Sequence, residues 1–185
     1  MNKIVNLRGT SGAGKSFVAY ELMTRFPTAP FRLDEKSRPV IYKVSIPGKV
    51  PLFIIGRYTT TCGGCDTIIH AETVVELVDY AATKGHVFFE GLLISSYWGG
   101  IGDWSERYAD RFIFAYLDTP LETCLQRIRQ RREAAGNTKP LNEANTTRRV
   151  SAIEATKRKA LALKRRVAII PHKKDPAGAV LELLK

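Results

Sequence analysis

The segment from Gly9 to Ser16, which reads GTSGAGKS, constrains this chain more than any other feature. It satisfies the spacing G-x-x-x-x-G-K-[ST], in which backbone N–H groups surround a phosphate. Glycines are needed there because side chains would block the approach of the backbone to the ligand. The apolar run at 3–7 predicts a buried strand before the loop, and the pattern at 16–26 predicts a helix after it. This setting supports the motif, so we predict a nucleotide triphosphate site.

The residue types of the loop predict its contacts. The lysine reaches the terminal phosphates as a point charge, and the hydroxyl of Ser16 ligates Mg²⁺. The positive end of the following helix dipole adds to the attraction. We expect ATP to contact Gly9, Thr10, Ser11, Gly12, Ala13, Gly14, Lys15 and Ser16. Farther along the chain, Pro171, His172 and Lys173 follow the last predicted strand and are expected at the edge of the adenine pocket.

Strands and helices are predicted to alternate along most of the chain. Buried strands are expected at 3–7, 86–90, 111–117 and 167–170, and helices at 16–26, 67–84, 120–135, 147–166 and from 176. Continuously apolar strands between helices predict a parallel sheet covered on both faces. We therefore expect a three-layer α/β fold with about five parallel strands, the first of them central.

Several local features refine this expectation. Two strand-like runs around Pro47-Gly48-Lys49 predict a β-hairpin inserted at 39–57. Gly85 is expected to cap the C-terminus of the 67–84 helix, and Asp175 to cap the N-terminus of the last helix. The segment 91–104 is expected to be irregular.

Length and composition indicate one domain, residues 1–185. No apolar run approaches the roughly 20 residues that span a bilayer, so we expect no membrane partner. The N-terminus lacks the apolar stretch of a signal peptide, and the three cysteines are too few for a disulfide framework. These features favour the cytoplasm. The sequence leaves the oligomeric state open.

Positive charge is concentrated in one part of the chain. The net charge is +11, and the segment 127–174 holds 15 Lys or Arg residues against three acidic ones. Such unevenness indicates a polyanionic partner, with nucleic acid as one candidate. The alternative is a solvated basic helix together with arginines that serve ATP alone.

The segment 57–66, RYTTTCGGCD, is the most unusual in the chain. Its Cys62-x-x-Cys65 pattern is compatible with zinc or redox chemistry, but no second cysteine pair completes a zinc site. We favour a substrate loop, in which glycines allow close approach, Tyr58 stacks a base and Arg57 holds a phosphate. The predicted substrate-binding residues are Arg57, Tyr58, Gly63, Gly64 and Asp66.

Three carboxylates are candidates for the group that accepts or orients the acceptor proton. Asp66 precedes the predicted 67–84 helix, so it is alternatively that helix's N-cap. Asp34 follows the first helix and is a rival base. Glu90 ends the strand at 86–90. The resemblance to P-loop kinases described below implies a carboxylate of the metal shell, or one that orients the acceptor, at this position, although many such kinases carry Asp there; the alternative is a buried structural acid.

The rest of the chain resembles the P-loop nucleotide and nucleoside kinases. The turn LDTPLE at 117–122 ends a strand and opens an arginine-bearing helix, and the polar segment 136–146 has the length of a kinase lid. The resemblance implies a lid region at 127–149. It also implies catalytic roles for Arg127 and Arg131 and an ATP contact for Arg132. A closing lid excludes water and brings positive charge to the phosphates.

The hairpin, the CGGCD loop and the lid together resemble a group of phage-type P-loop kinases. Some of these phosphorylate 5-hydroxymethyluracil in phage DNA, so the resemblance implies an ATP- and Mg²⁺-dependent kinase acting on DNA in the host cytoplasm. The basic segment agrees with that acceptor. Two alternatives remain: a kinase of free nucleosides or deoxynucleoside monophosphates, and an ATP-hydrolysing nucleic-acid-binding protein.

Overall fold

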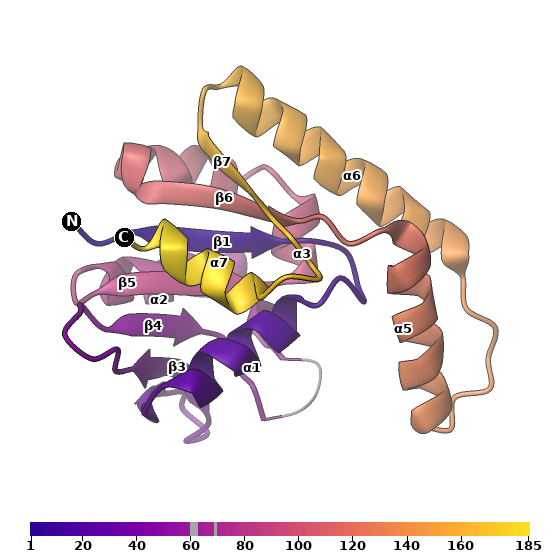
Figure 1. Ribbon diagram of the computed structural model, residues 1–185, viewed down its shortest axis with the longest axis horizontal. Coiled ribbons are helices and arrows are strands. Elements are labelled where there is room, and N and C mark those ends of the chain that lie inside the picture. Colours follow the sequence, from indigo (N-terminus) through magenta and orange to yellow (C-terminus); the bar gives the residue numbers. More distant parts are fainter. Residues whose placement is uncertain (60–62, 69) are drawn as a thin grey trace.

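A computed structural model of the protein describes residues 1–59, 63–68 and 70–185. Within this described part, the strands join one sheet in the order β2-β3-β4-β5-β1-β6-β7 (Figure 1). The strands are β1 (Ile4–Arg8), β2 (Thr28–Leu33), β3 (Pro39–Val44), β4 (Leu52–Ile55), β5 (His86–Glu90), β6 (Phe112–Leu117) and β7 (Arg166–Ile170). The strands β4, β5, β1, β6 and β7 are parallel, and β1 lies in their middle. This confirms the predicted parallel core with a central first strand.

Helices cover both faces of the sheet. The α-helices are α1 (Lys15–Arg25), α2 (Ala71–Ala82), α3 (Leu92–Ser96), α4 (Ile101–Trp104), α5 (Leu121–Ala134), α6 (Glu143–Ala162) and α7 (Pro176–Leu183). Two 3₁₀ helices, η1 (Cys65–Thr67) and η2 (Ser105–Arg111), lie between them. Helices α1 and α7 pack on one face, whereas α2, α3, α4 and α6 contribute to the core on the other. Helix α5 projects from the body with the loop that follows it (Figure 1).

The central strand shows why the chain forms three layers. All five residues of β1 are buried, and successive side chains point to opposite faces of the sheet. Ile4 belongs to the core under α2 and α6, while Val5 and Leu7 belong to the core under α1 and α7. A strand that is apolar on both sides needs a cover on both sides, as the fold provides.

Strand β2 was not predicted. The prolines Pro27 and Pro30 indicated a break, but β2 pairs antiparallel with β3 at the edge of the sheet and is largely exposed. An edge strand tolerates proline because one row of its N–H groups has no ladder partner to lose. Strand β3 also pairs antiparallel with β4, and β4 then continues into the parallel core.

Several predicted helix boundaries were wrong. Helix α2 begins at Ala71, with Asp66 well before its start, and ends at Ala82, so neither Asp66 nor Gly85 caps it. Helix α6 begins at Glu143 rather than Thr147, because the side chain of Asn142 accepts a hydrogen bond from the N–H of Asn145. The end of the predicted 136–146 loop is therefore helical.

The segment 91–104 differs from its prediction, whereas the start of α7 matches it. The segment expected to be irregular, 91–104, holds the short helices α3 and α4. The predicted N-cap of α7 is confirmed, since the carboxylate of Asp175 accepts a hydrogen bond from the N–H of Gly178. None of the helices in the described ranges is both long and apolar enough to cross a membrane.

Candidate active site

The glycine-rich loop connects the carboxyl end of β1 to α1, at the edge where parallel sheets bind ligands. Gly12 and Gly14 have φ angles of 76° and 105°, which L side chains rarely adopt. A Cβ on Gly12 would also lie 2.4 Å from the carbonyl oxygen of Cys124 on α5. The loop therefore needs glycine for its own backbone geometry and for its packing against α5. A cleft of about 380 Å³ opens on this loop.

Lys15 points into the cleft and is buried. Its ammonium group donates hydrogen bonds to the carbonyl oxygens of Gly9 (2.9 Å) and Thr10 (3.2 Å). Burial lowers the pKa of Lys15, and the charge of Glu90 opposes that effect. An anion in the cleft would offer this cation a stronger partner than two neutral carbonyl groups.

Glu90 ends β5 and faces the same cleft. Its Oε1 atom accepts hydrogen bonds from the hydroxyl of Ser16 (3.0 Å) and from the phenol of Tyr58 (3.4 Å). Burial raises the pKa of Glu90, although the charge of Lys15 acts against the rise. A Cβ on Gly64 would lie 2.2 Å from Oε1, so this glycine makes room for the carboxylate.

Asp66, within η1, also lines the cleft. Its two carboxylate oxygens accept hydrogen bonds from the N–H groups of Leu92 (2.6 Å) and Leu93 (3.0 Å). It therefore caps α3, which lies 26 residues later in the chain, instead of α2. This arrangement ties the segment 63–68 to the helix that follows Glu90.

Arg127 and Arg131 reach the cleft from α5. The guanidinium of Arg127 donates hydrogen bonds to the carbonyl oxygens of Gly12 (3.1 Å) and Ala13 (3.2 Å). Their i, i+4 spacing places both side chains on the face of α5 that meets the loop. The cleft thus combines three cationic side chains with two carboxylates.

Two predicted site residues lie elsewhere. The carboxylate of Asp34 accepts hydrogen bonds from the N–H groups of Lys36 and Arg38, both at 2.9 Å, and so shapes the turn between β2 and β3. Its Oδ2 atom also accepts from Arg57 (2.6 Å). These contacts keep Asp34 and Arg57 together and outside the residues that line the cleft, so the cleft gives no support to their predicted roles as a base and a phosphate ligand.

The surroundings of Tyr58 likewise give no support to the prediction that it stacks a base. Tyr58 is buried, and its ring meets those of Tyr20 and Tyr42 edge to face. Its phenol contacts Glu90, as described above. Of the cysteines in the same segment, Cys65 is buried, and burial raises the pKa of its thiol; Cys62 lies outside the described residues.

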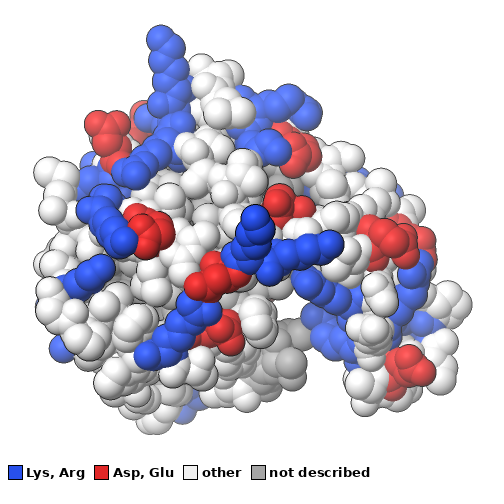
Figure 2. Space-filling model, viewed as in Figure 1, with Lys and Arg blue, Asp and Glu red and all other residues white. Residues whose placement is uncertain are grey.

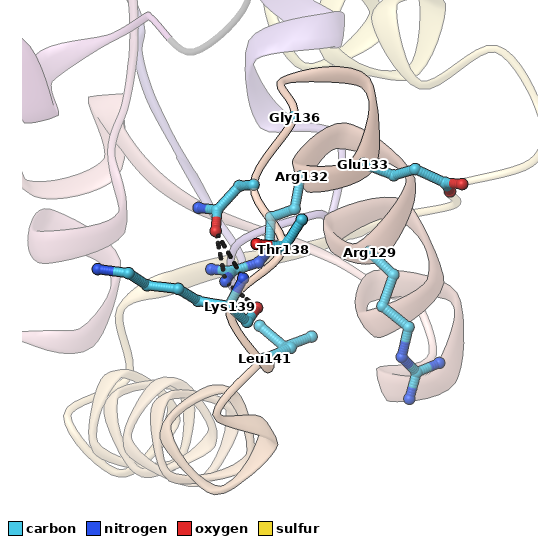
Figure 3. A pocket seen from close by; sticks show the side chains of 8 residues that line it. Arg129, Arg132, Glu133, Gly136, Thr138, Lys139 and Leu141 are labelled. Atoms are coloured by element: carbon cyan, nitrogen blue, oxygen red, sulfur yellow. Dashed lines mark hydrogen bonds between the residues drawn. The ribbon is translucent and has the colours of Figure 1, made fainter.

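Arg132, predicted to contact ATP, instead holds the loop that follows its own helix. Its guanidinium donates hydrogen bonds to the side-chain oxygen of Asn137 (3.2 Å) and to the carbonyl oxygen of Lys139 (2.5 Å), as Figure 3 shows. These residues line a separate hollow of about 340 Å³ between α5 and the loop (Figure 3). Arg132 points away from Arg131's face of the helix, because neighbouring helical positions diverge by about 100°.

A more apolar cavity of about 310 Å³ adjoins the phosphate-binding loop 9–16. It is lined by Ala13, Gly14, Phe17, Val18, Leu117, Arg127, His172 and Pro176. Asp118 positions His172, since its Oδ1 atom accepts from the backbone N–H (2.7 Å) and lies 2.8 Å from the ring Nδ1. The same hydrogen bonds lower the pKa of Asp118. His172 was predicted near the adenine ring, and it lines this largely apolar cavity beside the loop, a lining that suits a base.

Sequence reasoning missed three residues that shape the loop. The hydroxyl of Thr119 donates to the carbonyl oxygen of Ala13 (2.8 Å), and the N–H of Gly9 donates to Ser95 Oγ (3.3 Å). Arg8, directly before the loop, is fully buried over the ring of Phe114. Thr119 stood in a recognised turn and offered a signal, but Ser95 reaches the loop only through the packing of α3.

The sequence of the chain is similar to those of known proteins. A family model described as 5-hmdU DNA kinase matches residues 1–169. The chain is 36% identical over 162 residues to a 5-hmdU DNA kinase of Pseudomonas phage PaMx11, covering 85% of this chain and 84% of the relative. It is 32% identical over 172 residues to a 5-hmdU DNA kinase of Pseudomonas phage M6, covering 86% of each.

A solved structure shares the fold. The crystal structure of a gluconokinase from Sinorhizobium meliloti superposes with a TM-score of 0.50 at 13% sequence identity, covering 99% of this chain and 89% of that one. At this identity the likeness concerns the fold alone. It agrees with the three-layer α/β prediction.

Proposed function

The chain belongs to the 5-hmdU DNA kinase family, and from that premise we propose that it transfers the γ-phosphate of ATP to the hydroxymethyl oxygen of 5-hydroxymethyluracil in DNA. It is a P-loop kinase that uses ATP, as its relatives and fold indicate. The observation that carries the proposal for the site is one cleft that holds Lys15, Glu90, Asp66, Arg127 and Arg131. The whole chain is proposed to act as a single kinase domain in the host cytoplasm, where phage DNA is found.

The reaction needs an anion site, an acceptor site and a proton acceptor. We assign the triphosphate to the loop 9–16 and the adenine ring to the cavity beside Phe17 and His172. The acceptor oxygen attacks the γ-phosphorus, its bond to that atom forms, and the bond to the β-phosphate oxygen breaks as ADP leaves. Lys15, Arg127 and Arg131 stabilise the charge on the phosphoryl oxygens.

The acceptor's proton goes to a carboxylate in the cleft. Glu90 is already engaged by Ser16 and Tyr58 in a buried position, whereas Asp66 is exposed and has lone pairs free beyond the two N–H bonds it accepts. We therefore assign the proton to Asp66, and a supporting electrostatic role to Glu90. The general-base contribution of such a group is roughly 10²–10⁴-fold.

The residues present fit a magnesium ion. Ser16 Oγ and Glu90 Oε1 lie 3.0 Å apart, and a hydroxyl beside a carboxylate is an oxygen pair of the kind that this hard cation prefers. When bound, Mg²⁺ supplies charge neutralisation for the β- and γ-phosphates. The fit rests on the oxygen donors of Ser16 and Glu90.

The test offers different acceptors to the protein with γ-labelled ATP. DNA containing 5-hydroxymethyluracil, unmodified DNA of the same sequence, free 5-hydroxymethyldeoxyuridine and its monophosphate are compared. The proposal predicts label only in the modified DNA. Label in a free nucleoside or nucleotide at equal or higher kcat/KM contradicts it, and label in phosphate alone, whatever the acceptor, indicates an ATPase.

A further inference from the structure

Three hollows border α3. Leu92 lines the phosphate cleft, and the next residue, Leu93, lines a cavity of about 410 Å³. Ser96 and Arg149 line that cavity and also a third hollow of about 390 Å³, which Arg148 borders on α6. The phosphate cleft thus lies at the first residue of α3, and the two other hollows share the residues at its end.

The middle cavity exposes large apolar side chains. Leu93 is 58% exposed and Tyr97 is 62% exposed. Tyr97 directly follows α3 in an extended conformation, and both side chains line the same cavity. Exposed apolar groups that adjoin a polar cleft indicate a binding surface more often than isolated ones do.

Tyr97 is held in its exposed position. A Cβ on Gly99 would lie 2.2 Å from the Tyr97 hydroxyl and 2.3 Å from the ring carbon that bears it. The hydroxyl end of the ring therefore lies against Gly99, where only glycine leaves room for it, while much of the side chain stays exposed. An aromatic ring fixed in this way provides a stacking platform at low cost in conformational entropy.

Positive charge borders the same surface. Arg149 donates a hydrogen bond to Ser96 Oγ (3.0 Å), and Arg148 donates to the side-chain oxygen of Asn145 (3.2 Å). Neither arginine has a carboxylate partner within the part of the chain that the structure describes. Both guanidinium groups keep donors for an anion, and phosphate is the anion they suit best.

We propose that this surface, formed by Leu93, Ser96, Tyr97, Arg148 and Arg149 and here called the α3 groove, binds the DNA strand beside the acceptor base. The inference rests on the proposed function. The base flanking the acceptor stacks on Tyr97 and Leu93, and the strand's phosphates contact Arg148 and Arg149. The acceptor base then enters the phosphate cleft, one residue away at Leu92.

Stacking chemistry explains why an opened strand is the occupant. A base inside a duplex cannot reach the transferred phosphate, so it must leave the stack, and its neighbour loses a stacking partner. An aromatic side chain replaces that partner without regard to sequence, because every base has a π-face. Asp66 holds the first N–H groups of α3, which fixes the groove relative to the cleft.

The experiment compares Tyr97→Ala and the double variant Arg148→Ala/Arg149→Ala with matched controls. Tyr80→Ala and Arg107→Ala remove an exposed tyrosine on α2 and an exposed arginine on η2, which precede the strands β5 and β6. Affinity for a single-stranded oligonucleotide carrying one 5-hydroxymethyluracil is measured by fluorescence anisotropy. Steady-state assays give the KM for that DNA and for ATP, and thermal unfolding reports the fold.

Tyr97→Ala is expected to weaken DNA binding by about 5- to 100-fold, the range of one lost base–aromatic stack. The KM for DNA rises accordingly, while the KM for ATP is unchanged. Tyr97→Phe restores affinity, because the ring alone stacks. The double arginine variant weakens binding and lowers the slope of log affinity against log salt by about 1 to 2. The two controls leave these quantities unchanged.

Other outcomes overturn the inference. If the wild-type protein phosphorylates the DNA and both groove variants keep its KM, the groove is not the DNA site and the proposed function stands. If the wild-type protein phosphorylates only free nucleotides, the proposed function fails and the groove with it. If Tyr97→Ala instead converts a dimer into a monomer without changing the affinity for DNA, the surface is a contact between two copies of the chain.

Discussion

Burial of the Glu90 carboxylate lowers the stability of the fold when the group is charged, while the same carboxylate serves the proposed site. Its carboxylate is buried beside Ser16 and Tyr58, and burial raises its pKa. The folded state therefore binds the proton of Glu90 more tightly than the unfolded chain does. The stability that this proton contributes is present below about pH 4.3, the pKa of an unperturbed glutamate. It is lost as the pH rises through the higher folded-state pKa.

Glu90→Gln removes that titration. Without nucleotide and in the presence of a chelator, the free energy of unfolding of the variant should exceed that of the wild-type protein by an amount that grows from pH 5 to pH 8. Phosphoryl transfer should nevertheless fall, since the negative charge is lost. Urea unfolding at several pH values is the measurement, and curves that run parallel for the two proteins would show that the carboxylate carries no such cost.

Lys15→Ala should abolish phosphoryl transfer with the fold intact. The charge is needed as the γ-phosphate departs, so we expect turnover to fall by at least about 100-fold. Circular dichroism and thermal unfolding serve as controls for the fold. Turnover above about a tenth of the wild-type value, a loss under ~1.4 kcal/mol in barrier terms, is incompatible with the assigned role.

The sequence predicted those parts of the site that depend on local spacing. The loop 9–16 and the pair Arg127 and Arg131 follow from motifs within one turn or one helix, and the structure brings them to one cleft. Asp34, Tyr58 and Arg132 lie outside the residues that line this cleft, because tertiary partners decide their positions. A carboxylate within reach of Arg57, or a phenol beside Glu90, cannot be recognised from neighbours in the chain.

At the scale of elements, Asp66 links a loop to a helix. Because it caps α3, Asp66→Ala should lower the free energy of unfolding by about 1 kcal/mol, the usual worth of an N-cap. Asp66→Asn keeps one capping oxygen and should be more stable than the alanine variant. If Asp66 also accepts the acceptor's proton, the asparagine variant loses turnover by roughly 10²–10⁴-fold at unchanged ATP affinity.

Comparing the two variants separates the roles. Normal turnover in Asp66→Asn would assign Asp66 to structure alone and leave Glu90 as the base. The asparagine variant therefore tests whether Asp66 accepts the acceptor's proton. The alanine variant does not test this, because it also disturbs α3. Chemical denaturation and single-turnover kinetics provide the two readouts.

The loop between α5 and α6 should act as a lid. Arg132 holds it through Asn137 and Lys139, so Arg132→Ala should loosen it. We expect faster hydrogen exchange at 135–142 and more ATP hydrolysis relative to transfer, because a loose lid admits water. Gln126→Ala on the same helix is the control, since Gln126 is exposed and is not among the residues that line the hollow beside the loop. An unchanged ratio of ATP hydrolysis to phosphoryl transfer would show that the loop does not exclude water from the site.

The fold itself was predictable where burial dictates the pattern. The strands β1, β5 and β6 are continuously apolar, and the helices between them carry the expected periodicity. Strand β2 was missed because it is exposed, so no hydrophobic pattern marks it, and its pairing with β3 is what makes it a strand. The start of α6 was misjudged because capping by Asn142, rather than apolar spacing, sets it.

At the scale of the whole molecule, basic residues lie on the arm that α5 and the loop after it form. Figure 2 shows Lys and Arg side chains on the projecting arm, around the hollow between the arm and the body. Some charges of the segment 127–174 are already engaged. Lys157 pairs with Glu154 at 2.7 Å, and Lys159 lies over the ring of Trp98. The positive charge that is available to a polyanion is therefore smaller than the 15 Lys and Arg residues of this segment suggest.

The last prediction concerns that polyanion. If the basic segment meets DNA, affinity should fall steeply between roughly 50 and 200 mM salt, because each neutralised phosphate releases counterions. Lys157→Glu/Arg158→Glu/Lys159→Glu should weaken DNA binding and flatten the slope while sparing ATP hydrolysis measured without acceptor. Arg158 should account for most of the effect, since it is exposed and, among the residues that the structure describes, neither a carboxylate nor a ring pairs with its charge.

Lys36→Glu provides the matched control, since Lys36 is exposed in the turn between β2 and β3 at the opposite edge of the sheet. It should leave the salt slope unchanged. If the triple variant instead raises the KM for ATP, the basic helix serves the nucleotide's own phosphates through the lid. A flat salt response combined with rapid phosphorylation of a free nucleotide would show that the acceptor carries few charges, and the chain would then be a kinase of small molecules built on the same cleft.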